Sequence, residues 1–331
     1  MTIRDKKEVK KTNASVFIPH LGCPHKCSFC NKNAITEKEK SVSSADVHSI
    51  LENHARSLKR RGMTAEIAFF GGTFTALNEQ YRGELLQIAN EYIKRSPDIF
   101  VGIRCSTRPD YVTDEILSML EEYNVTAVEL GAQSMADDVL AANNRGHASD
   151  DVRKAVGLIK ARRHRFELGL QMMTGLYKDT IVKSLYTADE LIKLKPDTVR
   201  IYPTVVFEGT ELYKMKHTPF TQEETIELCA QIYGRFISNN IRVIRIGLNY
   251  GGNVIGELSI SRYYYKKMLD FMGGADFGNP DAPRKFKIFT DKRNISKING
   301  HKCENKIKLE KLGFIYKIKE KPGAELEIYE V

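Results

Sequence analysis

The sequence predicts an α/β fold in which a partial TIM-like barrel of six βα units, (βα)6, is followed by a small, basic α+β domain. Three observations support this prediction: apolar, β-branched segments recur along the chain, helical patterns separate them, and basic residues gather near the C-terminus. Regular alternation of strand and helix indicates parallel βαβ units. Six units are too few for a closed eight-stranded barrel, so we expect an open one.

The strands and helices of the barrel can be placed from their patterns. The expected strands are residues 14–20, 65–70, 98–104, 125–131, 166–173 and 197–203. Between residues 43 and 62 one helical face holds Val47, Ile50, Leu51, Ala55 and Leu58, and Gly62 ends the helix. The same reasoning predicts helices at about 79–95, 113–123, 149–163 and 180–194, with Thr113 and Ser149 as N-caps. Ligands of such folds bind at the C-terminal ends of the strands.

The pattern changes after Asn249, so we expect one domain over residues 1–250 and a second over residues 251–331. The segment 284–321 holds thirteen Lys or Arg against four Asp or Glu, a balance of +9 that equals the net charge of the whole chain. Such a segment suits RNA or an acidic electron-transfer partner, and the alternative is a solvated lysine-rich surface.

Within the second domain, residues 295–320 predict a strand, a turn at Gly300, a short helix with Ile307, Leu309 and Leu312, and another strand. That order resembles a KH-type RNA-binding unit, although Cys303 stands where the second glycine of its G-x-x-G loop is expected. The alternative is a lid over the open barrel.

Composition places the chain among cytoplasmic proteins. Hydrophobic residues make up 42% of its 331 residues and charged residues 28%, and the longest apolar runs are too short to span a bilayer. The N-terminal MTIRDKKEVKK has no apolar core of the kind that secretory signals carry. A reducing cytoplasm keeps cysteines as thiols, which favours metal or catalytic roles for clustered ones.

Three of the six cysteines lie in GCPHKCSFC, residues 22–30, where Cys23, Cys27 and Cys30 form C-x3-C-x2-C. Three thiolates can hold three irons of a 4Fe-4S cluster and leave the fourth iron open to a small molecule. The alternative is a zinc site with His20 or His25 as the fourth ligand.

The cysteine loop directly follows the first expected strand, and other polar or glycine-containing motifs end the next five. They are FFGGTFT (69–75), IRCSTRPD (103–110), ELGAQS (129–134), QMMTGL (171–176) and IYP (201–203). Because parallel strands end at the same edge of a sheet, these six motifs predict a single site at one rim of the barrel.

The cysteine loop, with Phe29 before its last cysteine, resembles the hallmark of the radical S-adenosylmethionine (radical SAM) superfamily. The resemblance implies the partial barrel of the radical SAM type, a 4Fe-4S cluster on Cys23, Cys27 and Cys30, and S-adenosylmethionine chelating the fourth iron. One electron from the reduced cluster would then cleave the sulfonium to a 5'-deoxyadenosyl radical, which abstracts hydrogen from the substrate.

The resemblance also implies which residues hold S-adenosylmethionine. The Gly71 and Gly72 carbonyls with the Thr73 hydroxyl would accept from the methionyl ammonium, although Gly-Gly is also a common βα turn. Arg145 matches the arginine that clamps the carboxylate in relatives such as oxygen-independent coproporphyrinogen oxidase. The ribose and adenine contacts would come from Phe29, Ser106, Gln133, Gln171, Gly175 and the segment 201–203, which includes Tyr202.

Over about residues 14–250 the chain resembles the family of the Elongator catalytic subunit, on the motifs STRPDYVTDEIL, ELGAQSM, NRGH, MMTGLYKDT and PDTVRIYPTVVFEGTELY. That family combines a radical domain with an acetyltransferase domain to modify the wobble uridine of tRNA. The first cysteine spacing here is shorter than in that family, and we find no R-x-x-G-x-G/A acetyltransferase signature. We therefore expect the radical half of this chemistry from the chain, and not acetyl transfer.

The expected substrate is tRNA, bound through the basic segment 284–321, and the expected electron donor is a low-potential protein such as flavodoxin or ferredoxin. Two alternatives stay open. One is a radical enzyme acting on a small molecule such as a tetrapyrrole, and the other is a zinc-containing RNA-binding protein without catalysis.

Overall fold

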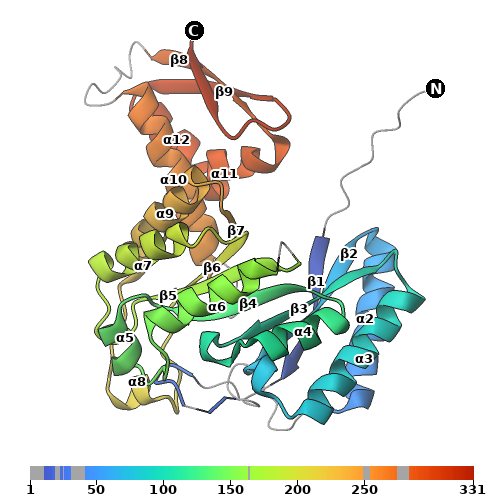
Figure 1. Cartoon of the computed structure of the whole chain (residues 1–331). Helices are drawn as coiled ribbons and strands as arrows, with labels where there is room; N and C mark the ends of the chain where they lie inside the picture. The colour runs from blue at the N-terminus through green and yellow to red at the C-terminus, as the bar shows by residue number, and fades with distance from the viewer. Residues whose placement is uncertain are drawn as a thin grey trace, which may run out of the picture. The chain divides into compact units, whose positions relative to one another are not determined.

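The computed structural model describes residues 11–18, 23–24, 26–30, 42–162, 165–248, 254–273 and 283–331 (Figure 1). Its strands are β1 Lys11–Ile18, β2 Thr64–Gly71, β3 Phe100–Thr107, β4 Val125–Gln133, β5 Glu167–Thr174, β6 Thr198–Pro203, β7 Arg242–Ile246, β8 Arg284–Thr290, β9 Phe314–Glu320 and β10 Glu327–Glu330. Its helices are α2 Ser44–Arg61, α3 Glu79–Arg95, α4 Asp114–Glu122, α5 Asp137–Ala142, α6 Ser149–Ala161, α7 Ile181–Lys193, α8 Glu211–Lys214, α9 Gln222–Ser238, α10 Val254–Met272, α11 Ile295–Asn299 and α12 Glu304–Lys311. Of the helices in these ranges, none is long and apolar enough to cross a membrane.

The larger sheet has the strand order β1-β2-β3-β4-β5-β6-β7, so neighbours in the chain are neighbours in the sheet. The pairs from β1 to β5 are parallel. Helices α2, α3, α4 and α6 lie along one face of these strands (Figure 1). The predicted α/β partial barrel is therefore confirmed, with six strands where expected. The seventh strand, β7, was not expected, because its five residues include two arginines and give only a short apolar signal.

Side chains alternate between the two faces of the strands. On β1, Ala14, Val16 and Ile18 are at most 2% exposed, whereas Phe17 is 42% exposed. Helix α2 contributes Val47, Leu51 and Leu58 to the buried core, as predicted, whereas Ile50 and Ala55 of the expected face are only partly buried. The apolar core of this sheet thus lies under the helices, and the opposite, concave face is free to carry polar residues.

The helix caps agree with the sequence except at one position. The Thr113 hydroxyl accepts from the backbone N–H of Ile116 and caps α4, as predicted. The prediction of Ser149 as an N-cap is wrong: Ser149 is the first residue of α6, and the N-cap is Ala148. The reason is that Asp137 accepts from the Ser149 backbone N–H at 2.7 Å, so a carboxylate from α5 serves the helix end.

Residue contacts divide the chain into two compact units. The first comprises 1–200 with 204–219, and the second comprises 201–203 with 220–331. The expected boundary after residue 250 lies in 249–253, outside the described residues, and stays a prediction.

The second unit contains a three-stranded sheet of order β10-β8-β9, in which β8 and β9 are parallel and β10 is antiparallel to β8. One face of this sheet packs on helices α10, α11 and α12. The buried residues there are Tyr264, Met268, Met272, Phe286, Ile288, Ile298, Leu309, Phe314, Tyr316 and Ile328. The expected small α+β domain is therefore present.

Two local expectations for this unit are wrong. The segment 295–299 is helix α11 and not a strand, because Ile298 is fully buried and Ile295, three residues earlier, lies on the same helical side. Ile307 was expected on the apolar face of α12, but it is 48% exposed while Leu309 is fully buried. The turn at Gly300 is confirmed, since its φ of 79° ends α11.

Candidate active site

The sequence motifs follow the C-terminal ends of neighbouring parallel strands, as predicted. The three motif cysteines, Cys23, Cys27 and Cys30, come after β1, which ends at Ile18, and Gly71 is the last residue of β2. Strands β3, β4 and β5 end at Thr107, Gln133 and Thr174. The candidate site is therefore built on one edge of the larger sheet.

The cysteine loop is anchored through Ser28. Its backbone N–H donates to the Asn143 carbonyl at 3.0 Å, and its hydroxyl donates to the Asn143 Oδ1 at 2.6 Å. The Ser28 carbonyl in turn accepts from the Leu212 backbone N–H at 3.0 Å. Asn143 is fully buried, and its amide also donates to the carbonyls of Val139 and Tyr177. One buried asparagine thus fixes the loop to the segments that follow β4 and β5.

Two of the three motif cysteines contact residues that the sequence assigns to the cofactor. The Cys23 Sγ lies 3.4 Å from the Thr73 Oγ1, and the Arg145 Nη1 donates to the Cys27 Sγ at 3.5 Å. Among the described residues, no three His, Cys, Asp or Glu side chains converge closely enough to hold a metal ion. The assignment of Cys23, Cys27 and Cys30 as iron ligands therefore stays a prediction from their spacing.

Arg145 lies at the centre of a buried polar cluster and is 7% exposed. Its Nη2 donates to the Gly131 carbonyl at 2.7 Å, and its Nε is buried without a partner among the described residues. The Gln133 Oε1 is also buried without a partner there, and Gln133 adopts a left-handed φ of 65°. Gly131 leaves the space for both, since a Cβ there would lie 2.8 Å from the Gln133 amide nitrogen and 2.9 Å from the Arg145 Nη2.

These unsatisfied groups fit the cofactor that the sequence implies. A buried guanidinium with an open N–H suits a carboxylate, and a carboxamide oxygen with no donor suits a hydroxyl or an amine. Arg145 also contacts Cys27, so the predicted ligand of the carboxylate lies next to the cysteine loop. The assignment of these residues to an S-adenosylmethionine site stays a prediction.

The cofactor contacts of the other predicted residues stay predictions, and two of these residues, Gly71 and Gly175, have local roles in this structure. Gly71 has a φ of 111°, and a Cβ on it would lie 2.6 Å from the Ile18 carbonyl oxygen, so close packing of β1 already requires glycine. The Gly175 N–H donates to Asp179 at 2.8 Å, and its carbonyl contacts the His217 Nε2 at 2.9 Å. The remaining predicted residues are partly buried: Phe29 in the loop, Gly72 after β2, Ser106 on β3 and Tyr202 on β6.

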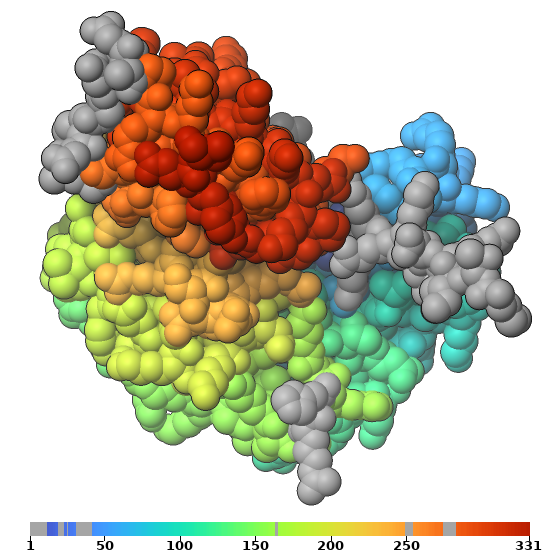
Figure 2. All heavy atoms as spheres, turned by 90° about the horizontal axis from the view of Figure 1, so that it is seen from above, coloured from blue at the N-terminus to red at the C-terminus, as the bar shows by residue number. Residues whose placement is uncertain are grey.

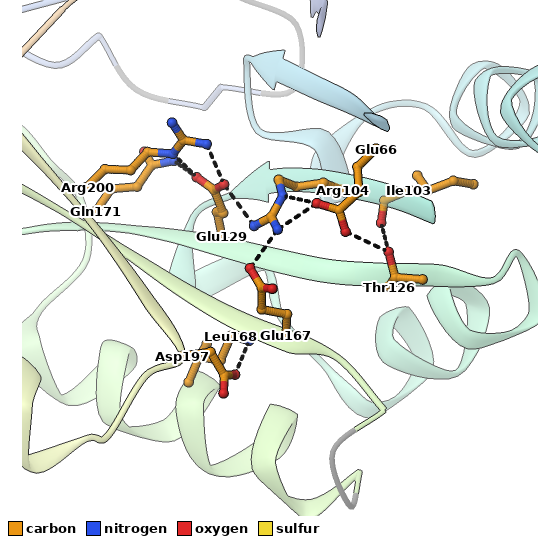
Figure 3. Close-up of polar contacts among 10 residues, drawn as sticks. All are labelled: Glu66, Ile103, Arg104, Thr126, Glu129, Glu167, Leu168, Gln171, Asp197 and Arg200. Carbon is orange, nitrogen blue, oxygen red and sulfur yellow. Dashed lines mark hydrogen bonds and ion pairs between the residues drawn. The ribbon is translucent and has the colours of Figure 1, made fainter. Parts of the chain in front are cut away.

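Below the strand ends, a buried network of charged residues crosses five strands (Figure 3). Glu129 on β4 is 1% exposed and accepts from Arg200 at 2.7 and 2.9 Å and from Arg104 at 3.1 Å. Arg104 also donates to Glu66 at 2.7 Å and to Glu167 at 2.6 Å. The network links β2, β3, β4, β5 and β6 and makes this part of the barrel interior polar.

Gln171 belongs to this network, because its amide donates to Glu129 at 2.7 Å. Burial alone would raise the pKa of Glu129, but the hydrogen bond and charge of Arg200, with Arg104 and Gln171, hold that pKa below 4.5. Glu129 is therefore a carboxylate at neutral pH and orients the Gln171 amide.

Two aromatic rings lie beside the network on the concave face. Phe17 and Phe70 have ring centroids 6.3 Å apart, and the Arg200 guanidinium carbon lies 5.3 Å from the Phe70 centroid. Phe17 is 42% exposed, so part of its ring is accessible to solvent. An exposed aromatic ring is a surface on which a planar group can stack.

His147 lies near Arg145 and has a fully buried side chain. Its Nε2 contacts the Ala132 carbonyl at 3.3 Å, and its Nδ1 is 3.9 Å from Asp110. Burial, followed by the charges of Arg145 and Arg108, lowers the pKa of His147 to about 4. The imidazole is therefore neutral near pH 7 and adds no charge beside the guanidinium.

Sequence reasoning missed Asn143 and the Glu129 network. Asn143 lies two residues before Arg145, directly before the NRGH motif, but its role depends on Ser28, 115 positions away. Glu129 lies in the quoted ELGAQS motif, and a charged residue inside an apolar strand was the available signal. Its two arginines could not be identified without the strand order.

Comparison with known families agrees with the geometry. Residues 17–191 match the family model described as Radical SAM superfamily, and residues 196–260 match the Radical_SAM C-terminal domain.

Similar proteins agree with the family match. The chain is 28% identical over 301 residues to a tRNA uridine(34) acetyltransferase of Methanocaldococcus infernus, covering 75% of this chain and 55% of that protein. It is 30% identical over 189 residues to human Elongator complex protein 3, covering 50% of this chain and 34% of that protein. The chain thus spans only about a third to a half of the length of these curated relatives.

Solved structures show the same fold. Archaeal Methanocaldococcus infernus Elp3 superimposes with a TM-score of 0.61 at 21% identity, covering 84% of this chain and 70% of that chain. Coproporphyrinogen III oxidase from Escherichia coli gives a TM-score of 0.50 at 16% identity, covering 70% and 53%.

Proposed function

Because this chain belongs to the radical SAM superfamily and is one of its enzymes, we propose that it binds a 4Fe-4S cluster and S-adenosylmethionine and acts on tRNA. The observation that supports the proposal best is the position of Arg145. It contacts Cys27 of the expected cluster loop and the end of β4, and its Nε is buried without a partner among the described residues.

In this proposal Cys23, Cys27 and Cys30 hold the cluster. When bound and reduced, the cluster supplies the electron that cleaves S-adenosylmethionine to a 5'-deoxyadenosyl radical for hydrogen abstraction. Asn143 keeps the loop in place through Ser28, so the three thiolates keep a fixed position relative to the strand ends.

Arg145 grips the methionyl carboxylate, and Gln133 offers its unsatisfied carboxamide oxygen to a hydroxyl or amine of the same molecule. Thr73, whose hydroxyl lies beside Cys23, accepts from the methionyl ammonium with the Gly71 and Gly72 carbonyls. The neutral His147 leaves Arg145 as the positive group that faces the carboxylate.

We favour tRNA as the substrate over a tetrapyrrole. The relatives named for tRNA uridine modification, or as Elongator complex protein 3, match the chain at 28 to 30% identity. Among the solved structures, Elp3 superimposes with a TM-score of 0.61 and the coproporphyrinogen oxidase with a TM-score of 0.50. The partly exposed Phe17 ring, which lies beside Phe70, suits a nucleobase taken out of its stack. The family membership also disfavours a purely zinc-containing binding protein.

The proposal includes a low-potential electron donor such as flavodoxin or ferredoxin and a cytoplasmic location. Both follow from the chemistry, since a reduced cluster needs an electron source and clustered thiols need a reducing compartment.

The test begins with anaerobic purification and reconstitution with iron and sulfide. The dithionite-reduced protein is incubated with S-adenosylmethionine, with and without tRNA, and 5'-deoxyadenosine and tRNA nucleosides are measured by mass spectrometry. We expect 5'-deoxyadenosine in both reactions, more of it with tRNA, and a new modified nucleoside.

Two results would overturn parts of the proposal separately. Protein that holds no iron, or a cluster whose electron paramagnetic resonance spectrum ignores S-adenosylmethionine, would overturn the cofactor assignment. If tRNA does not stimulate the cleavage of S-adenosylmethionine and gains no modified nucleoside, the assignment of tRNA as the substrate is overturned.

A further inference from the structure

The sheet of the second unit has two chemically different faces. In β8 the buried residues Phe286, Ile288 and Thr290 alternate with Lys285, Lys287 and Phe289, and β9 continues the alternation. Since successive strand residues point to opposite faces, the buried set lies on helices α10 to α12 and the other set lies on the face away from them. We call this second set the outer sheet face: Lys285, Lys287, Phe289, Ile315, Lys317, Lys319, Glu327 and Tyr329.

The outer sheet face is basic, and its register places the charges in adjacent rows. Lys287 is opposite Lys317 on β9, and on its other side it is opposite Tyr329 on β10. Phe289, which follows Lys287 on the same face of β8, is opposite Lys319 on β9. None of Lys285, Lys287, Lys317 and Lys319 forms an ion pair with a residue that the structure describes, and Lys285, Lys317 and Lys319 are exposed. The charge of the acidic member, Glu327, is offset by Lys321 at 2.7 Å.

Two aromatic rings lie beside these lysines: Tyr329 on the edge strand β10 is opposite Lys287, and Phe289 on β8 is opposite Lys319. Tyr329 is 52% exposed, and its ring packs edge-on against Phe289 with centroids 5.7 Å apart and planes at 81°. In Figure 2, which views the chain from above, residues of β10 (dark red) lie at the surface of this unit. The outer sheet face therefore combines an exposed aromatic ring on the edge strand β10 with ammonium groups on the adjacent strand β8 and on β9 beyond it.

We propose that the outer sheet face binds an unpaired segment of RNA, with Tyr329 stacking on a base and Lys287, Lys317 and Lys319 contacting the phosphates. Open sheets that present aromatics and basic residues bind single-stranded RNA in this way, because every base has a stacking face and every nucleotide a negative charge. An acidic protein would match the charges but gives no reason for an exposed aromatic ring beside them. This inference rests on the proposed function for its substrate class, and it adds a second, separate contact with that RNA.

The test uses the full chain, a fluorescent single-stranded oligouridine of about 12 nucleotides, within the range that such platforms cover, and total tRNA. Lys287, Lys317 and Lys319 are changed together to Gln, and the salt dependence of binding is measured by fluorescence anisotropy. Binding weakens with salt, and each phosphate contact to a single strand adds about 0.7 to the steepness of the fall of log K with log salt. The steepness should therefore decrease by about 2 in the triple variant.

Stacking is tested at one position with a matched pair. Tyr329→Ala should weaken oligouridine binding about tenfold, whereas Tyr329→Phe, which keeps the ring, should bind like the wild type. The same oligonucleotide in a duplex should bind more weakly than the single strand, because its bases are paired.

The control variant Lys306→Gln with Lys311→Gln removes two exposed charges from helix α12 and leaves the sheet unchanged. It should retain the wild-type salt slope. If this variant loses RNA affinity while the sheet variants keep it, the RNA binds on the helical side and the inference is wrong.

Failures of the two proposals can be told apart. Wild-type protein that binds neither oligouridine nor tRNA at low salt would overturn the RNA substrate itself. Wild-type protein that binds tRNA equally well in all sheet variants would overturn only the outer sheet face. A wild-type dimer that becomes monomeric in those variants, by analytical ultracentrifugation, would assign the face to contact between two copies.

Discussion

The buried carboxylate Glu129 allows a quantitative prediction through the substitution Glu129→Gln. The change keeps the shape of the side chain but removes the charge that Arg200 and Arg104 contact. Breaking a buried ion pair costs about 3–5 kcal/mol. Arg104 keeps Glu66 and Glu167, and the new carboxamide oxygen still accepts hydrogen bonds, so we expect the low end, about 3 kcal/mol.

The matched control is Glu167→Gln, on the same arginine. Glu167 has a side chain 23% exposed, against 1% for Glu129, so solvent replaces part of the lost contact and we expect about 1 kcal/mol. At about 2–4 °C per kcal/mol for a unit of this size, Tm should fall by about 6–12 °C for Glu129→Gln and by about 2–4 °C for Glu167→Gln. Anaerobic differential scanning calorimetry measures both. Equal shifts, or a Glu129→Gln shift below about 2 °C, would refute the network as a source of stability.

The pH dependence gives an independent check of the same prediction. The folded pKa of Glu129 is lower than its ordinary value of 4.5, so its stabilisation is fully present above pH 4.5 and is lost as the pH falls through the folded pKa. The difference in Tm between wild type and Glu129→Gln should therefore be constant above pH 5 and narrow in more acidic buffer. A difference that widens in acid would contradict the assignment.

Three further predictions concern the site. Cys27→Ser should abolish iron and sulfide incorporation on reconstitution, whereas Cys303→Ser, at an exposed thiol far along the chain, should retain both; colorimetric iron analysis distinguishes them. Arg145→Ala should keep its iron but bind S-adenosylmethionine about 10- to 150-fold more weakly in equilibrium dialysis, because the change removes a charge-assisted hydrogen bond. Unchanged affinity for S-adenosylmethionine would show that Arg145 is not part of the site. His147 has a folded pKa of about 4 against 6.5 unfolded, so the stabilisation that depends on its neutral form is complete above pH 6.5 and falls by about 3 kcal/mol toward pH 4. The variant His147→Asn should lack this decline in urea unfolding curves. An identical pH profile in the variant would show that another group titrates.

The sequence by itself determined the class of fold and where its chemistry is built. Apolar strand segments and helix periodicity follow from local rules, so six strands and five of the helices between them could be placed to within a few residues. The spacing of Cys23, Cys27 and Cys30 is local too, and it indicated the family that residues 17–191 match. Predictions failed where the local pattern was short or ambiguous, as in β7, α11 and the cap of α6.

The tertiary structure decided which side chains meet. Ser28 and Asn143 are 115 positions apart, and Glu129 and Arg200 are 71 apart, so no periodicity or spacing could pair them. Which face of β8 and β9 is buried likewise depends on helices α10 to α12 packing on one side of the sheet, which leaves Lys287, Lys317 and Tyr329 together on the other. Strand order and register are set by packing over the whole chain, and the contacts that make a site are fixed only when those long-range neighbours are known.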